Sequence, residues 1–234
     1  MKADKGFQRK PFFPVTLTLT GILIGLLLAL LAVWADYEST AYGFSRRAQA
    51  SFGGLSCPIF MGRSQSSVVS IKVSNPTERT ISPSVRTEIS TPIEFEVELD
   101  HIQLAPGEQI TLQRAIGPEN IDLGMFIFVS TLVFSAFPLA DRQTTCGILV
   151  LPTSNGALLL IIGAALSVLF MAAGTYLLYK NGWFVRRSRS ILFTVAATML
   201  AMFFSFMGWW LVAGALLILS VLTLVTTAGS LFTS

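Results

Sequence analysis

Uncharged apolar stretches occupy three parts of the chain. They cover residues 14–35, 157–179 and 190–234, and about 20 mostly apolar residues suffice to cross the hydrocarbon core of a bilayer. The last stretch is too long for one span, and Gly208-Trp209-Trp210 lies near its middle. Because glycine eases a turn and tryptophan favours the membrane interface, we divide it there. The pattern predicts four transmembrane helices: residues 14–35, 157–179, 191–207 and 211–232.

The first of these stretches also has the ingredients of a cleaved signal peptide. Basic residues precede it, and Val33-Trp34-Ala35 resembles a cleavage site. Its apolar run of about 20 residues is longer than the 7–15 residues of a signal-peptide core. We therefore interpret residues 14–35 as a retained anchor.

Between the first two apolar stretches, the pattern changes to short β-type segments. Residues 67–74, 84–90, 93–99, 109–116 and 147–151 are rich in β-branched or alternating residues, and proline or glycine turns separate them. The clearest alternation places Ile93, Phe95, Val97 and Leu99 on one face, which we expect to be buried. Together with residues 125–137, these segments make six or seven strands, which predict one all-β sandwich of immunoglobulin-like type over residues 66–152.

Residues 125–137 allow two interpretations. They are apolar enough for a fifth span, yet too short to cross a bilayer as a helix, and β-branched and aromatic side chains dominate them. A fifth span would also place the next basic loop on the wrong side of the membrane. We therefore expect a buried central strand.

The juxtamembrane segment, residues 36–65, has a weaker pattern. Residues 41–52 are compatible with a short helix lying on the membrane, with Tyr42, Phe44 and Phe52 as its apolar contacts.

The β-rich region begins with Cys57-Pro58, contains an Asn75-Pro76 turn and a Leu104-Ala105-Pro106-Gly107-Glu108 turn, and ends with Cys146-Gly147-Ile148. In this layout it resembles bacterial membrane-anchored proteins with an extracytoplasmic immunoglobulin-like sandwich. The resemblance covers about residues 57–152, concerns architecture, and implies no activity.

Basic residues near the spans predict the orientation of the chain. The tail of residues 1–13 and the loop of residues 180–190 should both be cytoplasmic, which places residues 36–156 outside and both termini inside a multi-pass cell-membrane protein. The basic residues that we expect to meet lipid headgroups are Lys2, Lys5, Arg9, Lys10, Lys180, Arg186, Arg187 and Arg189.

Composition supports this topology, and the net charge of the chain divides unequally between its two sides. Only 12% of the 234 residues are charged and 53% are hydrophobic, against about 25% charged in a typical soluble domain. The net charge of +3 divides into +7 on the cytoplasmic segments and −4 on the outer segment. The basic pI of about 9.1 is therefore a signal of topology, and we expect lipid contacts and no nucleic-acid partner.

Both cysteines, Cys57 and Cys146, lie in the outer segment, where disulfides are permitted. A bridge between them would close a loop of about 90 residues, worth roughly 4–5 kcal/mol in the chain-entropy model. The alternative is two separate buried thiols; we expect the disulfide.

No catalytic or metal site is predicted. His101 is the only histidine, and phosphate-binding, dinucleotide and metalloprotease motifs are absent from the sequence, so we expect no cofactor and no enzyme activity. Glu94, Glu96, Glu98 and Asp100 fall on one strand face and are a possible acidic docking surface. The competing interpretation is a solvated face that protects a sheet edge.

The predicted spans contain small residues and no ionisable ones. Gly21, Gly25 and Ala29 fall on one helix face and should allow close helix packing. Without intramembrane charges, a pump, channel or proton-coupled carrier is disfavoured.

The sequence therefore favours a non-catalytic accessory, scaffold or assembly subunit of a membrane complex, with other membrane-protein subunits as partners. The alternatives are a surface sensor or adhesin-type binding protein, and a permease-like transport component. A permease of that kind needs a large cytoplasmic coupling element, and the only predicted cytoplasmic loop of this chain is residues 180–190.

Overall fold

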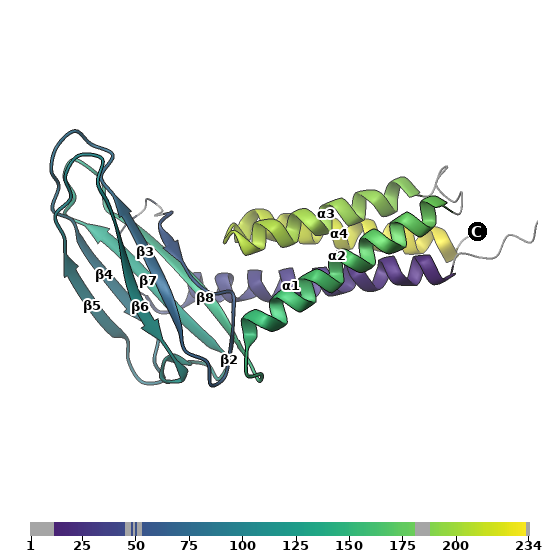
Figure 1. Cartoon of the computed structure of the whole chain (residues 1–234), viewed down its shortest axis with the longest axis horizontal. Coiled ribbons are helices and arrows are strands. Elements are labelled where there is room, and N and C mark those ends of the chain that lie inside the picture. The colour runs from purple at the N-terminus through teal and green to yellow at the C-terminus, as the bar shows by residue number, and fades with distance from the viewer. Residues whose placement is uncertain (1–11, 45–47, 49, 51–52, 181–187, 233–234) are drawn as a thin grey trace, which may run out of the picture. The chain divides into compact units, whose positions relative to one another are not determined.

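The computed structural model describes residues 12–44, 48, 50, 53–180 and 188–232. The chain forms two compact units. The helical unit contains Met1–Leu30, Ile161–Phe204 and Leu211–Ser234, and the sandwich unit contains Leu31–Leu160 and Ser205–Trp210. Figure 1 labels helices α1 to α4 and strands β2 to β8.

Four long helices form where the uncharged stretches lie. They are α1 (Phe12–Ala41), α2 (Gly156–Lys180), α3 (Ser188–Phe206) and α4 (Trp210–Phe232). With 30 and 25 residues, α1 and α2 are long and apolar enough to span a membrane, whereas the apolar parts of α3 and α4 are shorter. Helix α1 continues past the end of the apolar run at residue 35, so its last turns carry polar side chains.

The break between α3 and α4 lies at the predicted position. Gly208 has a φ of +73°, a backbone conformation that residues with a Cβ atom rarely adopt. Its amide donates to the carbonyl of Ser205 at 3.1 Å and closes the turn. Over the described residues 190–232, the uncharged stretch therefore forms two helices.

Small and hydroxyl-bearing residues line the helix contacts in the helical unit. A Cβ atom added to Gly21 would lie 2.7 Å from the backbone nitrogen of Met171, and one added to Gly25 would lie 2.7 Å from the hydroxyl of Ser167. That hydroxyl donates to the carbonyl of Gly21 at 2.8 Å, and Ala29 is fully buried. The small residues thus lie where α1 approaches its neighbours closely, as helices do in lipid.

The described residues of the sandwich unit form eight strands in two sheets. One sheet has the order β1-β3-β6 and the other β2-β8-β7-β4-β5. The strands are β1 (Leu55–Ser56), β2 (Phe60–Gly62), β3 (Ser67–Ser74), β4 (Ser84–Ile89), β5 (Glu96–His101), β6 (Gln109–Ile116), β7 (Phe126–Phe134) and β8 (Arg142–Leu151). A short 3-10 helix, Pro118–Asn120, precedes β7.

Two apolar clusters hold the sheets together. One joins Val69 and Ile116 of the smaller sheet to Ile89, Val129 and Ile148 of the larger sheet. The second joins β3 to β4 and β7 in the same way. The all-β, two-sheet architecture is therefore confirmed; its finer immunoglobulin-like classification stays a prediction.

Strand β7 decides between the two interpretations of residues 125–137, a fifth span and a central strand. It pairs with β8 on one side and with β4 on the other, and eight of its nine residues are buried. The segment is the central strand of the larger sheet and not a fifth span.

The prediction for residues 41–52 is not confirmed. Helix α1 ends at Ala41, and the described residues 42–44, 48 and 50 are not helical. Tyr42 and Phe44 pack on the sheet, as described below, while Phe52 lies outside the described residues.

Candidate functional site

The end of α1 lies against strand β8 of the larger sheet. Gly147 allows this approach, because a Cβ atom there would overlap the carbonyl group of Ala35 and lie 3.0 Å from the backbone nitrogen of Asp36. One residue before Ala35 on α1, the ring of Trp34 meets Phe126 of β7 edge-on, with 5.3 Å between ring centroids. Any side chain at position 147 would force the helix end away from the sheet.

Aromatic rings continue this contact beyond the end of α1. Tyr42 packs on Phe128 at a centroid distance of 4.3 Å and on Phe95 at 5.6 Å, and Phe44 packs on Phe95 at 5.0 Å. The Tyr42 hydroxyl also donates a hydrogen bond to the carboxylate of Asp122. Burial, together with this bond and the charge of Asp122, raises the pKa of Tyr42, so the phenol stays protonated. These contacts fix the chain on the sheet directly after the helix.

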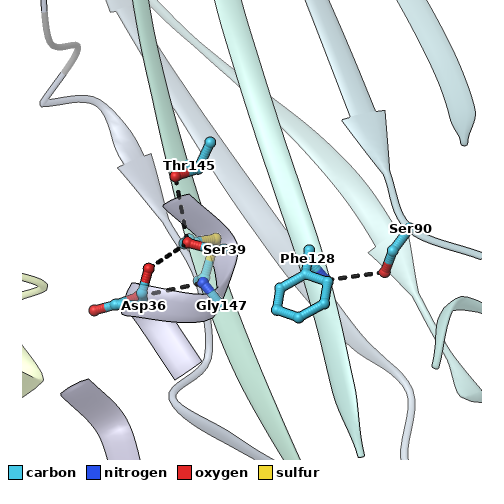
Figure 2. The surroundings of a disulfide bond; sticks show 8 residues. Asp36, Ser39, Ser90, Phe128, Thr145 and Gly147 are labelled. Atoms are coloured by element: carbon cyan, nitrogen blue, oxygen red, sulfur yellow. Dashed lines mark hydrogen bonds between the residues drawn. A yellow bond between two sulfur atoms is a disulfide. The ribbon is translucent and has the colours of Figure 1, made fainter. Parts of the chain in front are cut away.

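Asp36 is a largely buried carboxyl group, one residue beyond the expected span. Its Oδ1 atom accepts a hydrogen bond from the amide of Gly147 at 3.2 Å, as Figure 2 shows. Burial raises the pKa of Asp36 to about 7, although the Gly147 bond works in the opposite direction. Near neutral pH, this group can therefore either lose or keep its proton.

Ser39 links the same helix turn to β8. It is almost fully buried, donates to the carbonyl of Asp36 at 2.7 Å, and lies 3.3 Å from the hydroxyl of Thr145 (Figure 2). Helix and strand are thus joined through polar groups at two neighbouring positions.

The predicted disulfide lies beside these residues. Cys57 and Cys146 are bonded, with Cα atoms 6.5 Å apart, and Figure 2 shows the bridge next to Asp36 and Ser39. The alternative of two separate thiols is excluded, because neither cysteine is free. The bridge ties the beginning of the sandwich to its last strand.

A cavity of about 610 Å³ opens at this place within the sandwich unit. Its lining includes Asp36, Ser39, Tyr42, the disulfide, Gln143 and Trp210. Small-molecule sites have volumes of about 300–1,000 Å³ and combine apolar walls with a few polar groups. We therefore take this cavity, called the Asp36 cavity below, as the candidate binding site.

The second candidate surface from the sequence, the acidic row, faces the opposite way from the expectation. In the register of β4 and β5, Val85 lies opposite Asp100 and Ile89 opposite Glu96. Residues opposite each other share a sheet face, and Val85 and Ile89 are core residues. The acids of β5 therefore point toward the interior side, while Val97 and Leu99 point outward and are 49% and 53% exposed.

The expected burial of Ile93, Phe95, Val97 and Leu99 as one strand face is thus wrong. Strand β5 begins only at Glu96, and Ile93 is 96% exposed in the preceding turn. The physical reason is the unequal width of the sheets: three strands do not cover five, so the inner face of the edge strand reaches solvent. A period of two shows that a strand has two faces, but not which face meets the core.

Arg114 of β6 neutralises part of the acidic row. Its guanidinium group forms an ion pair with Glu98 at 2.7 Å and another with Asp100. Glu96 accepts from the side-chain amide of Asn120 at 3.2 Å, and Glu94 lies outside β5 on an exposed turn. Charges that point inward at a sheet edge hinder edge-to-edge pairing; docking of a basic partner on this row stays a prediction.

The other sequence-based site residues take ordinary places. His101 pairs with the hydroxyl of Ser84 at 2.8 Å on the outer edge of the sheet. Across the described residues there is no cluster of three or more metal-ligating side chains. Lys180 ends α2 and Arg189 belongs to α3, whereas Lys2, Lys5, Arg9, Lys10, Arg186 and Arg187 lie outside the described residues.

Sequence reasoning missed the Asp36 cavity. Its signal is weak but present: Asp36 directly follows an uncharged run, and Gly147 directly follows a cysteine in a strand. Their connection spans 111 residues, which no local pattern reveals.

Comparison with known proteins does not assign the chain to a family. No family model matches it, and no curated protein matches it in sequence.

Among solved structures, the chain is similar to the CARDB domain of PF1109 from Pyrococcus furiosus, at 15% identity and a TM-score of 0.35, covering 42% of this chain and 92% of that chain. A second structure of that domain, in complex with di-metal ions, is 14% identical with a TM-score of 0.34, covering 47% of this chain and 100% of that one. A beta-glucuronidase from Bacteroides uniformis is 15% identical with a TM-score of 0.31, covering 38% of this chain and 12% of that chain. Likenesses at this level carry no argument about function.

Proposed function

We propose that the protein is a non-catalytic accessory, scaffold or assembly subunit of a membrane complex. In this proposal, four helices span the membrane, both termini are cytoplasmic, and the sandwich between the first and second helices binds another subunit outside the membrane.

The outward surfaces of the helices support the membrane part of the proposal. Large apolar side chains remain exposed along the helices, among them Leu23, Leu27, Ile161, Ile218 and Val225. Water would make such surfaces costly at about 25 cal/mol per Å² of apolar area, whereas lipid or apolar helices of another subunit would cover them.

The observation that carries the partner-binding part is the outward face of β5. Val97 and Leu99 are about half exposed on an edge strand that pairs only with β4 among the described strands. Soluble surfaces rarely gather apolar side chains at a sheet edge without a use for them, because such edges invite pairing with other chains. A partner subunit that covers this face would bury both side chains.

Site-specific photocrosslinking tests this proposal in intact membranes. A photoreactive residue at position 97 should capture a discrete partner, which mass spectrometry identifies. The matched control is position 68, because Val68 is 47% exposed on the other sheet. Equal labelling at both positions, together with a monomer after gentle detergent extraction, would contradict a scaffold role.

The Asp36 cavity favours one alternative, a sensor-type protein that binds a small ligand. This role does not exclude the first, because the cavity and the outer face of β5 involve different residues. No described feature favours the permease-like alternative, and co-purification of an ATPase would be needed to support it.

A further inference from the structure

We infer that the Asp36 cavity binds an organic ammonium group, such as the amine headgroup of a phospholipid or a free small amine. This inference goes beyond the scaffold role and does not depend on a partner subunit.

Asp36 brings the only carboxylate to the described lining of the cavity. Among its described lining residues, Asp36 and Tyr42 are the only ionisable side chains, apart from the two cysteines bound in the disulfide. Oδ1 of Asp36 accepts from Gly147, while the described residues provide no hydrogen bond to Oδ2. The described lining contains no basic side chain to pair with this carboxylate when it is ionised, and a positive ligand would supply that charge.

The rest of the lining suits an ammonium group better than a metal ion. Calcium takes six to eight oxygen ligands, usually from several carboxylates, and the cavity lining offers one carboxylate. Aromatic rings of Tyr42, Phe44 and Trp210 also line the cavity, and such rings attract organic cations through their faces. The hydroxyls of Ser39 and Thr145 can accept N–H hydrogen bonds.

Size and location point to a headgroup rather than a bare ion. About 610 Å³ is far more than an ammonium ion fills and falls within the range of small-molecule sites. Asp36 directly follows the uncharged run of residues 14–35, so in the proposed topology it lies at the level of the headgroups. A lipid amine can therefore reach the cavity without leaving the bilayer.

Protonation of Asp36 should control this binding, because only the carboxylate pairs with a cation. Among the described lining residues, those on β8 (Gln143, Thr145 and Gly147) and on the α3–α4 turn do not titrate, and Tyr42 stays protonated. With a pKa of about 7 for Asp36, the carboxylate fraction at pH 6 is about one tenth of that at pH 8, so affinity should fall about tenfold.

The experiment uses the full-length protein in phosphatidylglycerol nanodiscs. In one arm, phosphatidylethanolamine is added and native mass spectrometry counts the retained lipid. In the other arm, free ethanolamine and choline are titrated by calorimetry. Saturable binding in the first arm alone assigns a lipid headgroup, and binding in the second assigns a free amine; both support an ammonium site.

Asp36→Asn removes the charge with little change in shape and should weaken binding at least tenfold at pH 8. The matched control is Glu38→Gln on the same helix, because Glu38 does not line the cavity and accepts a hydrogen bond from Trp34 at 2.8 Å. Binding to this control should equal that of the wild type.

The pH dependence of the wild type keeps the inference testable even if Asp36→Asn fails to fold. Absence of saturable binding in both arms, equal binding at pH 6 and pH 8, or full binding by a folded Asp36→Asn variant would each overturn it. Partner crosslinking at position 97 should be unchanged in Asp36→Asn, so failure of the ammonium site and failure of the scaffold role give different results.

Discussion

Replacement of both bridged cysteines, Cys57→Ala and Cys146→Ala, should destabilise the sandwich unit strongly. The bridge joins residues 89 positions apart. In the chain-entropy model, a closed loop of this length restricts the unfolded chain by about 4.6 kcal/mol at 25 °C. Loss of the two sulfur atoms from the apolar cluster that they contact should add to this cost.

Pulse proteolysis in increasing urea measures this effect on the full-length protein in detergent. The midpoint should shift to lower urea in the double variant by an amount equivalent to about 4–5 kcal/mol. A reducing agent should shift the wild type by a similar amount and leave the double variant unchanged. This second comparison separates the bridge from the packing of the sulfur atoms.

Two results would refute the reasoning. One is a difference below about 1 kcal/mol between wild type and double variant, since the loop would then cost the unfolded chain little entropy. The other is a reducing agent that destabilises the double variant as much as the wild type, because the effect would then not involve this bridge.

Three further changes test other contacts by the same assay. Gly147→Ala should lower the free energy of unfolding by about 3 kcal/mol, because its Cβ atom overlaps the backbone of α1. Gly43→Ala is the control and should change it very little, because no atom lies within 4 Å of a Cβ there. Equal effects of the two substitutions would contradict the close approach at Gly147. Arg114→Met should lower the free energy of unfolding by about 1 kcal/mol, because it leaves two carboxylates unpaired. In 1 M salt, the difference in stability from the wild type should become smaller. A difference that salt does not change would argue against the ion pairs. The folded-state pKa of Asp36 is raised to about 7, so the wild type should lose stability relative to Asp36→Asn as the pH rises from about 4 to 7. The loss should be at most about 4 kcal/mol, with no further change above pH 7. Parallel pH profiles of the two proteins would contradict burial of the charge.

Local patterns in the sequence predicted most of the elements. The strand expected at residues 67–74 has the same bounds as β3, because its β-branched residues stop at an Asn-Pro turn. The division of the last apolar stretch at Gly208 was also confirmed, since glycine there takes a left-handed backbone conformation. The disulfide followed from the location of both cysteines in the same outer segment.

The failures involve information that is not local. The face of β5 depends on its register with β4 and on the narrower opposite sheet, so alternation alone gave the wrong buried side. Tyr42 and Phe44 were expected at the membrane surface, yet their contacts are rings from β7 and from the segment before β5. The Asp36 cavity forms because β8 lies beside the end of α1, and no pattern within either segment predicts this contact.

The packing of the end of α1 on β7 and β8 also has a consequence for folding during synthesis. Tyr42 can form its hydrogen bond only after Asp122, 80 residues later, has been synthesised. Asp36 can form its bond only after Gly147, 111 residues later, has been synthesised. At about 5–20 residues per second, these groups remain without their partners for about 4 to 22 s after they are made. During that interval, the aromatic residues that follow the first helix are open to chaperones, to lipid and to incorrect contacts, and the sandwich can close over them only when its last strand has been made.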